Sequence, residues 1–244
     1  MGTSTTSKVL KLASFLFCLF SSGGCEFIEL PNVGKVNEVH HVNGNRMFAP
    51  WPEGFEETVL GMGCFWGAER LFWKQEGVFS TQVGYAGGTT EFPTYAEMKE
   101  ENKGKHAEVV RIIFDPAKIS FGELLQLFFE NHDPTQGDRQ GIDVGCQYRS
   151  VVFAQNEEQL LTALKTKILF QEQLAKIESR KDDLITTEIK IEKQFYYAED
   201  YHQQYLSKNP DGFCGLKNEG IKCPSPNDDF KGVPNEIKDS FEQS

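Results

Sequence analysis

The chain has 244 residues, of which 39% are hydrophobic and 25% charged, and this composition is typical of a globular protein with one domain of about 180 residues and flanking tails. A net charge of −11 argues against a bulk attraction to nucleic acid or to anionic membranes. Six cysteines are too few for a disulfide-built scaffold, and the absence of CxxC pairs makes zinc binding the weaker interpretation.

The N-terminal segment, residues 1–45, differs in character from the rest of the chain. Two lysines precede an apolar run at residues 12–20 and a small-residue stretch, which is the pattern of a secretory signal cleaved before Cys25. The run is too short for a transmembrane helix. The lack of acidic residues before Glu26 fits a transit peptide, although the lack of arginine weighs against it, and Met1–Thr6 fits N-myristoylation. We therefore predict a targeting or flexible segment and leave its type open.

The remainder of the chain predicts a mixture of strands and helices. Residues 107–114 are dense in β-branched side chains and form the clearest strand. In chain order, the predicted elements are a strand at 58–62, a helix from Cys64 to Gly77, a strand at 78–85, a helical patch at 96–101, the strand at 107–114, a helix opened by the Ser120–Glu123 capping box, a strand at 148–154, a long helix capped by Asn156, a strand at 185–192 and a short helix at 198–206.

This order predicts an α+β fold, a ferredoxin-like mixed sheet with packed helices and a long C-terminal coil. The long helix after Asn156 has Leu160, Leu161, Leu164 and Ile168 on one face. We place the catalytic domain at residues 46–224 and predict that the polar residues 225–244 are disordered.

Cys64 stands at a glycine-flanked turn between the first strand and the first helix. Backbone N–H groups and the helix dipole favour an anion there, so we expect the pKa of the thiol to fall below its usual value of about 8.5. Gly63 and Gly67 permit a tight turn and leave the sulfur uncovered. Phe65 and Trp66 offer two aromatic faces beside it. A buried structural cysteine is commoner in general, but these neighbours favour a reactive nucleophile.

The motif Gly63-Cys64-Phe65-Trp66-Gly67 closely resembles the active-site motif of the type A peptide methionine sulfoxide reductases. The likeness spans residues 45–224 and continues, in the family's order, through Gly84–Gly88, Pro93–Tyr95, His106–Val110, Asn131–Gln136, Gln147–Ser150, Tyr196–Leu206 and Gly212–Leu216. It implies an enzyme that reduces methionine S-sulfoxide, free or in peptides, and thereby repairs oxidised proteins.

The reaction needs a nucleophile, an acid for the departing oxygen and donors that polarise the S=O bond. Cys64 is the expected nucleophile. Glu108 matches the family's catalytic glutamate, and its place at the start of an apolar strand predicts a raised pKa. Tyr95 and Tyr148 match the family's two active-site tyrosines.

Substrate contacts are also implied by the resemblance. Asp143 matches the acidic residue that helps to hold the substrate, and Phe65 and Trp66 would form the pocket for the methyl group. Such a pocket distinguishes side chains by only about 1–3 kcal/mol, so it orients the substrate as much as it selects it.

Two cysteines near the C-terminus are expected to recycle the enzyme. A sulfenic acid on Cys64 condenses with a second thiol, and glycines on both sides of Cys214 let a mobile coil carry it there. The resemblance implies that a Cys64–Cys214 disulfide forms first and that Cys223 then relays the oxidation to thioredoxin. We expect no metal, flavin or nicotinamide cofactor, and a monomer.

Three departures from the family pattern surround this site. The segment from Tyr95 to Glu108 is one residue longer, Lys105 replaces a usual glycine, and Cys146 replaces a usual threonine. A redox sensor that binds methionine-containing surfaces without turnover is the alternative function. Thioredoxin recycling favours the cytoplasm or the mitochondrion, while the run at residues 12–20 keeps the secretory pathway open.

Overall fold

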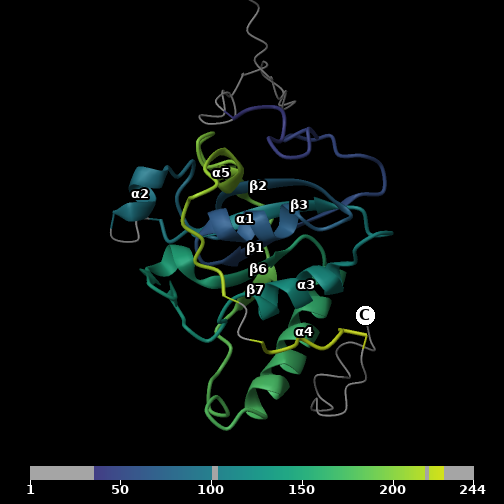
Figure 1. Cartoon of the computed structure of the whole chain (residues 1–244), viewed down its shortest axis with the longest axis vertical. Helices are drawn as coiled ribbons and strands as arrows, with labels where there is room; N and C mark the ends of the chain where they lie inside the picture. Colours follow the sequence, from purple (N-terminus) through teal and green to yellow (C-terminus); the bar gives the residue numbers. More distant parts are fainter. Residues whose placement is uncertain (1–35, 101–103, 218–219, 228–244) are drawn as a thin grey trace, which may run out of the picture.

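A six-stranded mixed sheet in the order β7-β6-β1-β3-β2-β8 forms the centre of the protein (Figure 1). The computed structural model describes residues 36–100, 104–217 and 220–227. Strands β6 and β7 are parallel, and the other neighbours are antiparallel. The strands are β1 (Glu56–Met62), β2 (Val78–Ala86), β3 (Ala107–Phe114), β6 (Ser150–Ala154), β7 (Glu188–Ile191) and β8 (Phe195–Tyr197), with a separate hairpin of β4 (Arg139–Gln140) and β5 (Asp143–Val144).

The helices begin at polar caps that the sequence supplies. Thr94 and Ser120 each accept a backbone N–H bond from a glutamate three residues on, whose side chain bonds back, and Asn156 caps the longest helix. The helices are α1 (Phe65–Trp73), α2 (Tyr95–Lys99), α3 (Phe121–Glu130), α4 (Glu157–Ala175) and α5 (Tyr205–Lys208), with a 3₁₀ turn, η2, at Cys146–Tyr148.

The main core lies between one face of the sheet and helices α1, α3 and α4. Alternate residues of the strands point into it, including Leu60, Met62, Val110 and Ile112, all of them buried. Their neighbours in sequence form a second, smaller cluster on the opposite face. Because β1 and β3 are the central strands, the ends of these strands are held rigidly by packing on both faces.

Most predicted strands and helices are confirmed, with two exceptions. Residues 200–204 form successive turns rather than a helix, and α5 begins only at Tyr205. Gln204 adopts a left-handed φ of 47°, and the side chain of Gln203 bonds to both backbone groups of Val83. The preceding residues form β8, which pairs with β2 and which the sequence pattern did not predict.

The apolar face of α4 that the sequence shows is only partly buried, with Leu160, Leu161 and Ile168 half-buried. Leu164 is 36% exposed, and the buried stripe runs instead through Ala163, Thr166, Phe170 and Leu174. Both sets have helical spacing, and only the position of α3 and the sheet decides between them.

Residues 36–45, which we assigned to the N-terminal segment, pack on the body of the protein. His40 is buried and its Nε2 bonds to Thr81 Oγ1 at 2.9 Å, while Asn43 donates to the carbonyl of Phe79. The apolar run at 12–20, the candidate cleavage site at Cys25 and the tail from 228 lie outside the described residues. Within the described part of the chain, every helix is too short or too polar to cross a membrane.

Candidate active site

Cys64 is the N-cap residue of α1, at the point where β1 ends. The N–H groups of Trp66 and Gly67 face its sulfur and favour the thiolate, as the sequence predicts. Burial and the charge of Glu108 outweigh them and raise the pKa of Cys64 from 9.0 to about 12. The prediction of a lowered thiol pKa is therefore wrong for the site without substrate, where burial and Glu108 favour the protonated thiol of Cys64.

Glu108 lies on β3 opposite Tyr85 of β2 and is 3% exposed. Its Oε2 accepts the N–H of Phe65 at 3.2 Å, which ties the carboxyl to the first turn of α1. Burial, with a smaller contribution from Asp143, raises the pKa of Glu108 to about 8. As we expected from the apolar strand, this carboxyl holds its proton at neutral pH.

Tyr148 marks the point at which the predicted polar residues meet. It ends η2, and burial raises the pKa of its phenol, as do the neighbouring charges. The groups whose charges reach this phenol are Glu108, Tyr95, Asp143 and Cys64. Residues from five separate elements thus lie close enough for their charges to act on one phenol, which no spacing in the sequence specifies.

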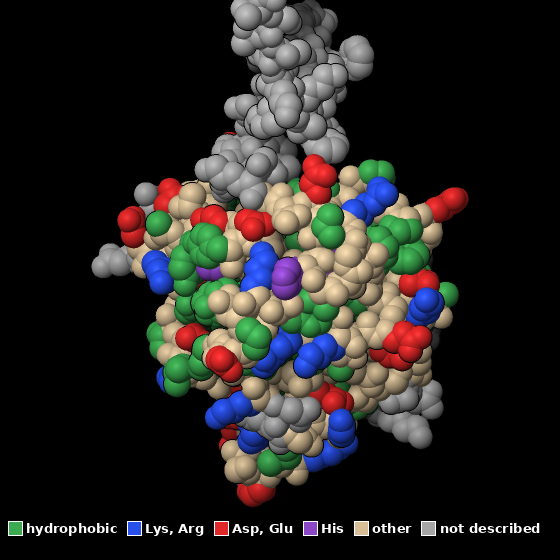
Figure 2. All heavy atoms as spheres, turned by 45° about the horizontal axis from the view of Figure 1, so that its top comes forward, with side chains coloured by type: hydrophobic (Ala, Val, Ile, Leu, Met, Phe, Trp, Pro, Cys, Tyr) green, Lys and Arg blue, Asp and Glu red, His purple; other side chains and the backbone are tan. Residues whose placement is uncertain are grey.

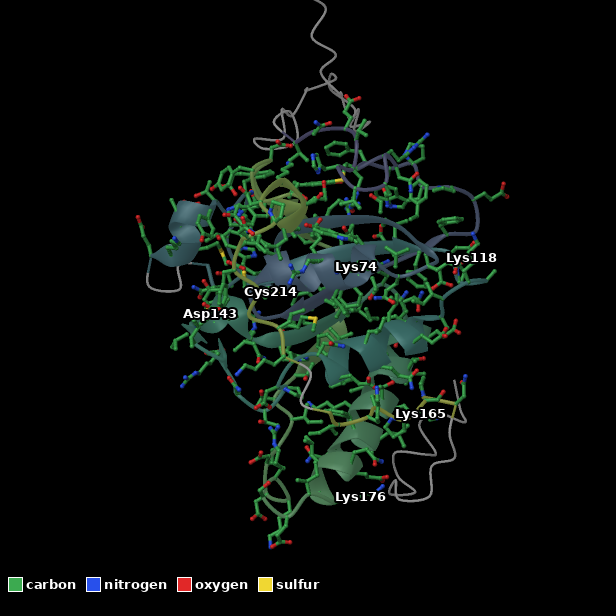
Figure 3. All side chains as sticks on the ribbon, viewed as in Figure 1. Lys74, Lys118, Asp143, Lys165, Lys176 and Cys214 are labelled. Atoms are coloured by element: carbon green, nitrogen blue, oxygen red, sulfur yellow. The ribbon has the colours of Figure 1, made fainter. Side chains whose placement is uncertain are left out.

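Asp143 enters this site from the β4–β5 hairpin (Figure 3). It is half-buried, and burial raises the pKa of its carboxyl. The side chain of Gln140 holds the hairpin in place, because it bonds to both backbone groups of Asp133 and lies against Gly63. A Cβ at Gly63 would be 2.7 Å from Gln140 Cγ, and its φ of 95° also favours glycine.

The two aromatic residues after Cys64 differ in their surroundings. Phe65 is 1% exposed and packs against Tyr85 and His202, so it forms the floor of the site. Trp66 is half-buried and stacks on Tyr205 with ring centroids 3.9 Å apart. Its indole N–H donates to Nδ1 of His202 at 3.0 Å. These contacts fix the indole plane at the site.

His202 is a site residue that our sequence analysis did not single out. Burial lowers the pKa of His202 to about 4, and because Nδ1 accepts from Trp66, the proton of the neutral ring is on Nε2. Nε2 is buried and has no hydrogen-bond partner. The ring also meets Tyr95 edge to face at 4.4 Å. The motif Tyr196–Leu206 contained this histidine, but the predicted helix gave no sign of its orientation.

Glu199 is a second residue that we missed. Its carboxylate accepts the hydroxyl of Tyr85 at 3.0 Å and the N–H of Tyr95 at 2.9 Å. It therefore fixes the start of α2, and with it the position of Tyr95. The side chain of Tyr95 is half-buried and lies beneath the ammonium of Lys99.

Cys214 lies beside the first turn of α1. A Cβ at Gly67 would be 3.0 Å from Cys214 Sγ, so the absence of a side chain at Gly67 makes room for this sulfur. Gly67 follows Cys64 by three residues in the sequence. The coil that carries Cys214 crosses the same side of the protein as Asp143 (Figure 3). Cys64, Cys214 and Cys223 are free thiols in the described chain.

Cys223, the thiol expected to relay the oxidation to thioredoxin, is buried. It is 4% exposed and packs on α3, where its N–H donates to Glu130 and its carbonyl accepts from Gln126. Burial raises the pKa of Cys223 to about 12. The sulfur must leave this position before it can attack a disulfide at Cys214.

The two unusual residues near the site have clear surroundings. Lys105 adopts a left-handed φ of 54°, the conformation that the family's usual glycine would tolerate without strain. Cys146 is buried at the start of η2, two residues before Tyr148. Among the described residues, no three His, Cys, Asp or Glu side chains are grouped so as to hold a metal ion.

Comparison with known proteins gives one consistent result. The family model described as peptide methionine sulfoxide reductase matches residues 56–227. The mitochondrial peptide methionine sulfoxide reductase of Rattus norvegicus is 58% identical over 186 residues, covering 76% of this chain and 78% of the relative. The peptide methionine sulfoxide reductase MsrA of Agrobacterium fabrum is 56% identical over 188 residues, covering 77% and 86%.

Solved structures agree with the sequence relatives. Methionine sulfoxide reductase A of Corynebacterium diphtheriae superposes with a TM-score of 0.66 at 36% identity, covering 81% of this chain and 99% of that one. Reduced Mxr1 from Saccharomyces cerevisiae gives a TM-score of 0.62 at 31% identity, covering 74% and 98%.

Proposed function

The chain belongs to the peptide methionine sulfoxide reductase family, whose reaction is the reduction of methionine sulfoxide, and we propose how its own residues carry out that reaction. The sulfur of Cys64 attacks the sulfoxide sulfur, and the S–O bond breaks as the protonated oxygen leaves as water. Water then adds to the Cys64 sulfur while the new S–S bond breaks, which releases methionine and leaves a sulfenic acid on Cys64. The methionine sulfur gains the two electrons that the cysteine sulfur loses. The convergence of Cys64, Glu108, Asp143 and Tyr148 on one volume carries this proposal.

Glu108 supplies the proton that the departing oxygen needs. A carboxyl with a pKa of about 8 is neutral at pH 7, and beside a thiol of higher pKa it can give up its proton to oxygen during the attack. Tyr95 and Tyr148 donate hydrogen bonds to the same oxygen, and Asp143 holds the substrate. Phe65 and Trp66 enclose the methyl group, with the indole held by His202. The S epimer and both free and peptide-bound substrates are part of this proposal.

Cys214 resolves the sulfenic acid. Its thiol displaces water from Cys64 and forms a disulfide, a step supported by the position of its sulfur beside Gly67. Cys223 then leaves its place on α3, attacks Cys214 and releases the Cys64 thiol. The dithiol of thioredoxin reduces the Cys214–Cys223 disulfide and completes the cycle.

We also assign to the catalytic domain limits wider than the 46–224 expected from the sequence. The packing of His40 on Thr81 and of Pro226 against Gly122 supports wider limits, residues 36–227. The ferredoxin-like class applies to the four central strands. It is supported by their order, β6-β1-β3-β2, by their antiparallel pairing and by the chain order β-α-β-β-α-β, if the short α2 and the β4–β5 hairpin are set aside.

The mitochondrion or the cytoplasm is the proposed compartment. The relative from rat is named as a mitochondrial protein, and a cycle that depends on free thiols suits a reducing environment. N-terminal sequencing of the native protein tests this proposal: a mature chain that starts at Cys25 or Glu26 would place it in the secretory pathway.

Turnover with a chemical reductant tests the reaction itself. With dithiothreitol and dabsyl-methionine sulfoxide, the wild type should form the sulfide, and resolved epimers should show that only the S form is consumed. Cys64→Ser should be inactive from the first equivalent while keeping the wild-type circular dichroism spectrum. A folded wild type that forms no sulfide would instead favour a methionine-binding redox sensor.

A further inference from the structure

Two strongly exposed apolar residues flank the site carboxylate on the β4–β5 hairpin. Ile142 is 79% exposed and Val144 is 68% exposed, whereas Asp143 between them is half-buried and its charge acts on Cys64 and Glu108. Successive side chains of a strand point to opposite faces. The hairpin therefore turns its polar residue into the site and two branched apolar side chains toward solvent.

A third exposed apolar residue comes from the C-terminal coil. Phe213 is 47% exposed, and a Cβ built at Gly215 would lie 3.1 Å from the Phe213 ring and 3.6 Å from Asp143 Oδ2. Gly215 thus adjoins both the ring and the carboxylate. We call Ile142, Val144 and Phe213 the apolar rim. Figure 2 shows hydrophobic side chains on both the left and the right of the face in view, and Figure 3 labels Asp143 and Cys214 on the left.

Folding does not require the two hairpin members of the rim. The hairpin is held by polar contacts, in which Gly145 N–H donates to the carbonyl of Asp138 and Gly141 N–H donates to Gln136. Single exposed apolar residues are common on protein surfaces. Three exposed apolar side chains around one site carboxylate form a local cluster, and such clusters mark binding surfaces.

From this arrangement we propose that the apolar rim binds apolar side chains next to the oxidised methionine of an extended polypeptide, an inference that rests on the proposed function. A methionine side chain that reaches Cys64 brings its backbone to the mouth of the site, beside Asp143. Extended chain advances about 3.3 Å per residue, so side chains one or two positions away lie over the hairpin. The rim adjoins the carboxylate that holds the substrate, because Ile142 and Val144 are the chain neighbours of Asp143 and the Phe213 ring and Asp143 both lie against Gly215, and this position identifies the occupant.

Sequences with apolar residues around methionine are those that a folded protein keeps in its core. The rim therefore directs the enzyme toward unfolded or damaged chains. The rim makes no contact with free methionine sulfoxide, because that substrate has no neighbouring side chains. Covering part of two branched side chains is expected to raise kcat/KM by about tenfold.

Two short peptides and one double variant test this proposal with dithiothreitol as reductant. The substrates are acetyl-Leu-Met(O)-Leu-amide, acetyl-Ser-Met(O)-Ser-amide and free methionine sulfoxide. The wild type should prefer the leucine peptide by about tenfold in kcat/KM. In Ile142→Ser/Val144→Ser this preference should fall to within about twofold, with kcat/KM for the serine peptide and the free amino acid unchanged.

Val42→Ser is the matched control. Val42 is 44% exposed, and the members of the rim are exposed as well. It lies away from the site, because its neighbour Asn43 bonds to Phe79 near the start of β2, whereas Tyr85 is near the other end of that strand. This variant should keep the wild-type preference. Thermal melting checks that each protein is folded, and the single variant Val144→Ser replaces the double one if the latter unfolds.

Several outcomes would overturn the proposal. They are equal wild-type rates on both peptides, a preference that survives in the rim variant, and an equal loss on all three substrates. A rim variant that changes only the KM for thioredoxin would identify a reductant dock instead. Wild type that reduces none of the sulfoxides would contradict the proposed function and not the rim.

Discussion

Replacing Glu108 with glutamine removes the acidic group and keeps the shape of the side chain. The amide keeps the size of the side chain, and its oxygen can still accept the N–H of Phe65. The substitution removes the proton that Glu108 would donate, and it also removes the negative charge that raises the pKa of Cys64. Stability and rate should therefore change in different, predictable ways.

The stability effect follows from the pKa of Glu108. Burial raises it from 4.5 to about 8, so between these values the folded chain holds a proton that the unfolded chain releases. The free energy of unfolding must then fall as pH rises through this range, by 1.36 kcal/mol for each pH unit. Wild type should lose roughly 4–5 kcal/mol through this carboxyl, and Glu108→Gln should not.

The rate effect follows from the loss of the general acid. At pH 7 sulfenic acid formation should slow by about 10²–10⁴, which is roughly 3–5 kcal/mol of barrier. Cys64 and Glu108 titrate as a pair, and the reactive form carries one negative charge. The wild-type rate should rise to about pH 8 and then level off. In the variant it should continue to rise, because only the thiol titrates.

Two measurements decide the outcome. Rapid-quench single turnovers across pH give the rate of methionine formation, and urea unfolding near pH 5 and near pH 9 gives the stability difference. Glu108→Asp keeps a carboxyl and should keep a levelling of the rate. A glutamine variant with the wild-type rate, or with the same levelling near pH 8, would show that another group is the acid.

Three further substitutions or labels test the rest of the site. Cys214→Ser should release one methionine per enzyme and then stop, because the Cys64 sulfenic acid lacks its resolving thiol; normal thioredoxin-driven turnover would contradict the assignment. Cys223, buried with a raised pKa, should react with iodoacetamide more slowly than Cys214 in a mass-spectrometric time course, and equal rates would argue against its position on α3. His202→Phe removes the acceptor for the Trp66 indole N–H and should raise the KM for methionine sulfoxide about tenfold. His202→Gln should bring the KM most of the way back to the wild-type value. An unchanged KM in the phenylalanine variant would refute the positioning role.

Local patterns in the sequence determined much of the fold. The β-branched run at 107–114 became β3 with the predicted limits, and the Ser120–Glu123 capping box opened α3 as expected. Both signals depend on nearby residues only, and therefore need no knowledge of the partner elements. The existence of β8 and the choice of the residues that α4 buries depend on what each element packs against, and the sequence pattern specified neither.

The site shows the same division. The sequence motifs singled out Cys64, Glu108, Tyr95, Tyr148 and Asp143 as candidates one by one. Their convergence, and the sign of the pKa shift at Cys64, came only from the tertiary structure. The helix N-terminus lowers the thiol pKa as the sequence suggests, but burial and the Glu108 carboxyl across the sheet raise it by more. Desolvation is a property of everything that surrounds a group, so no local pattern at Cys64 can specify it.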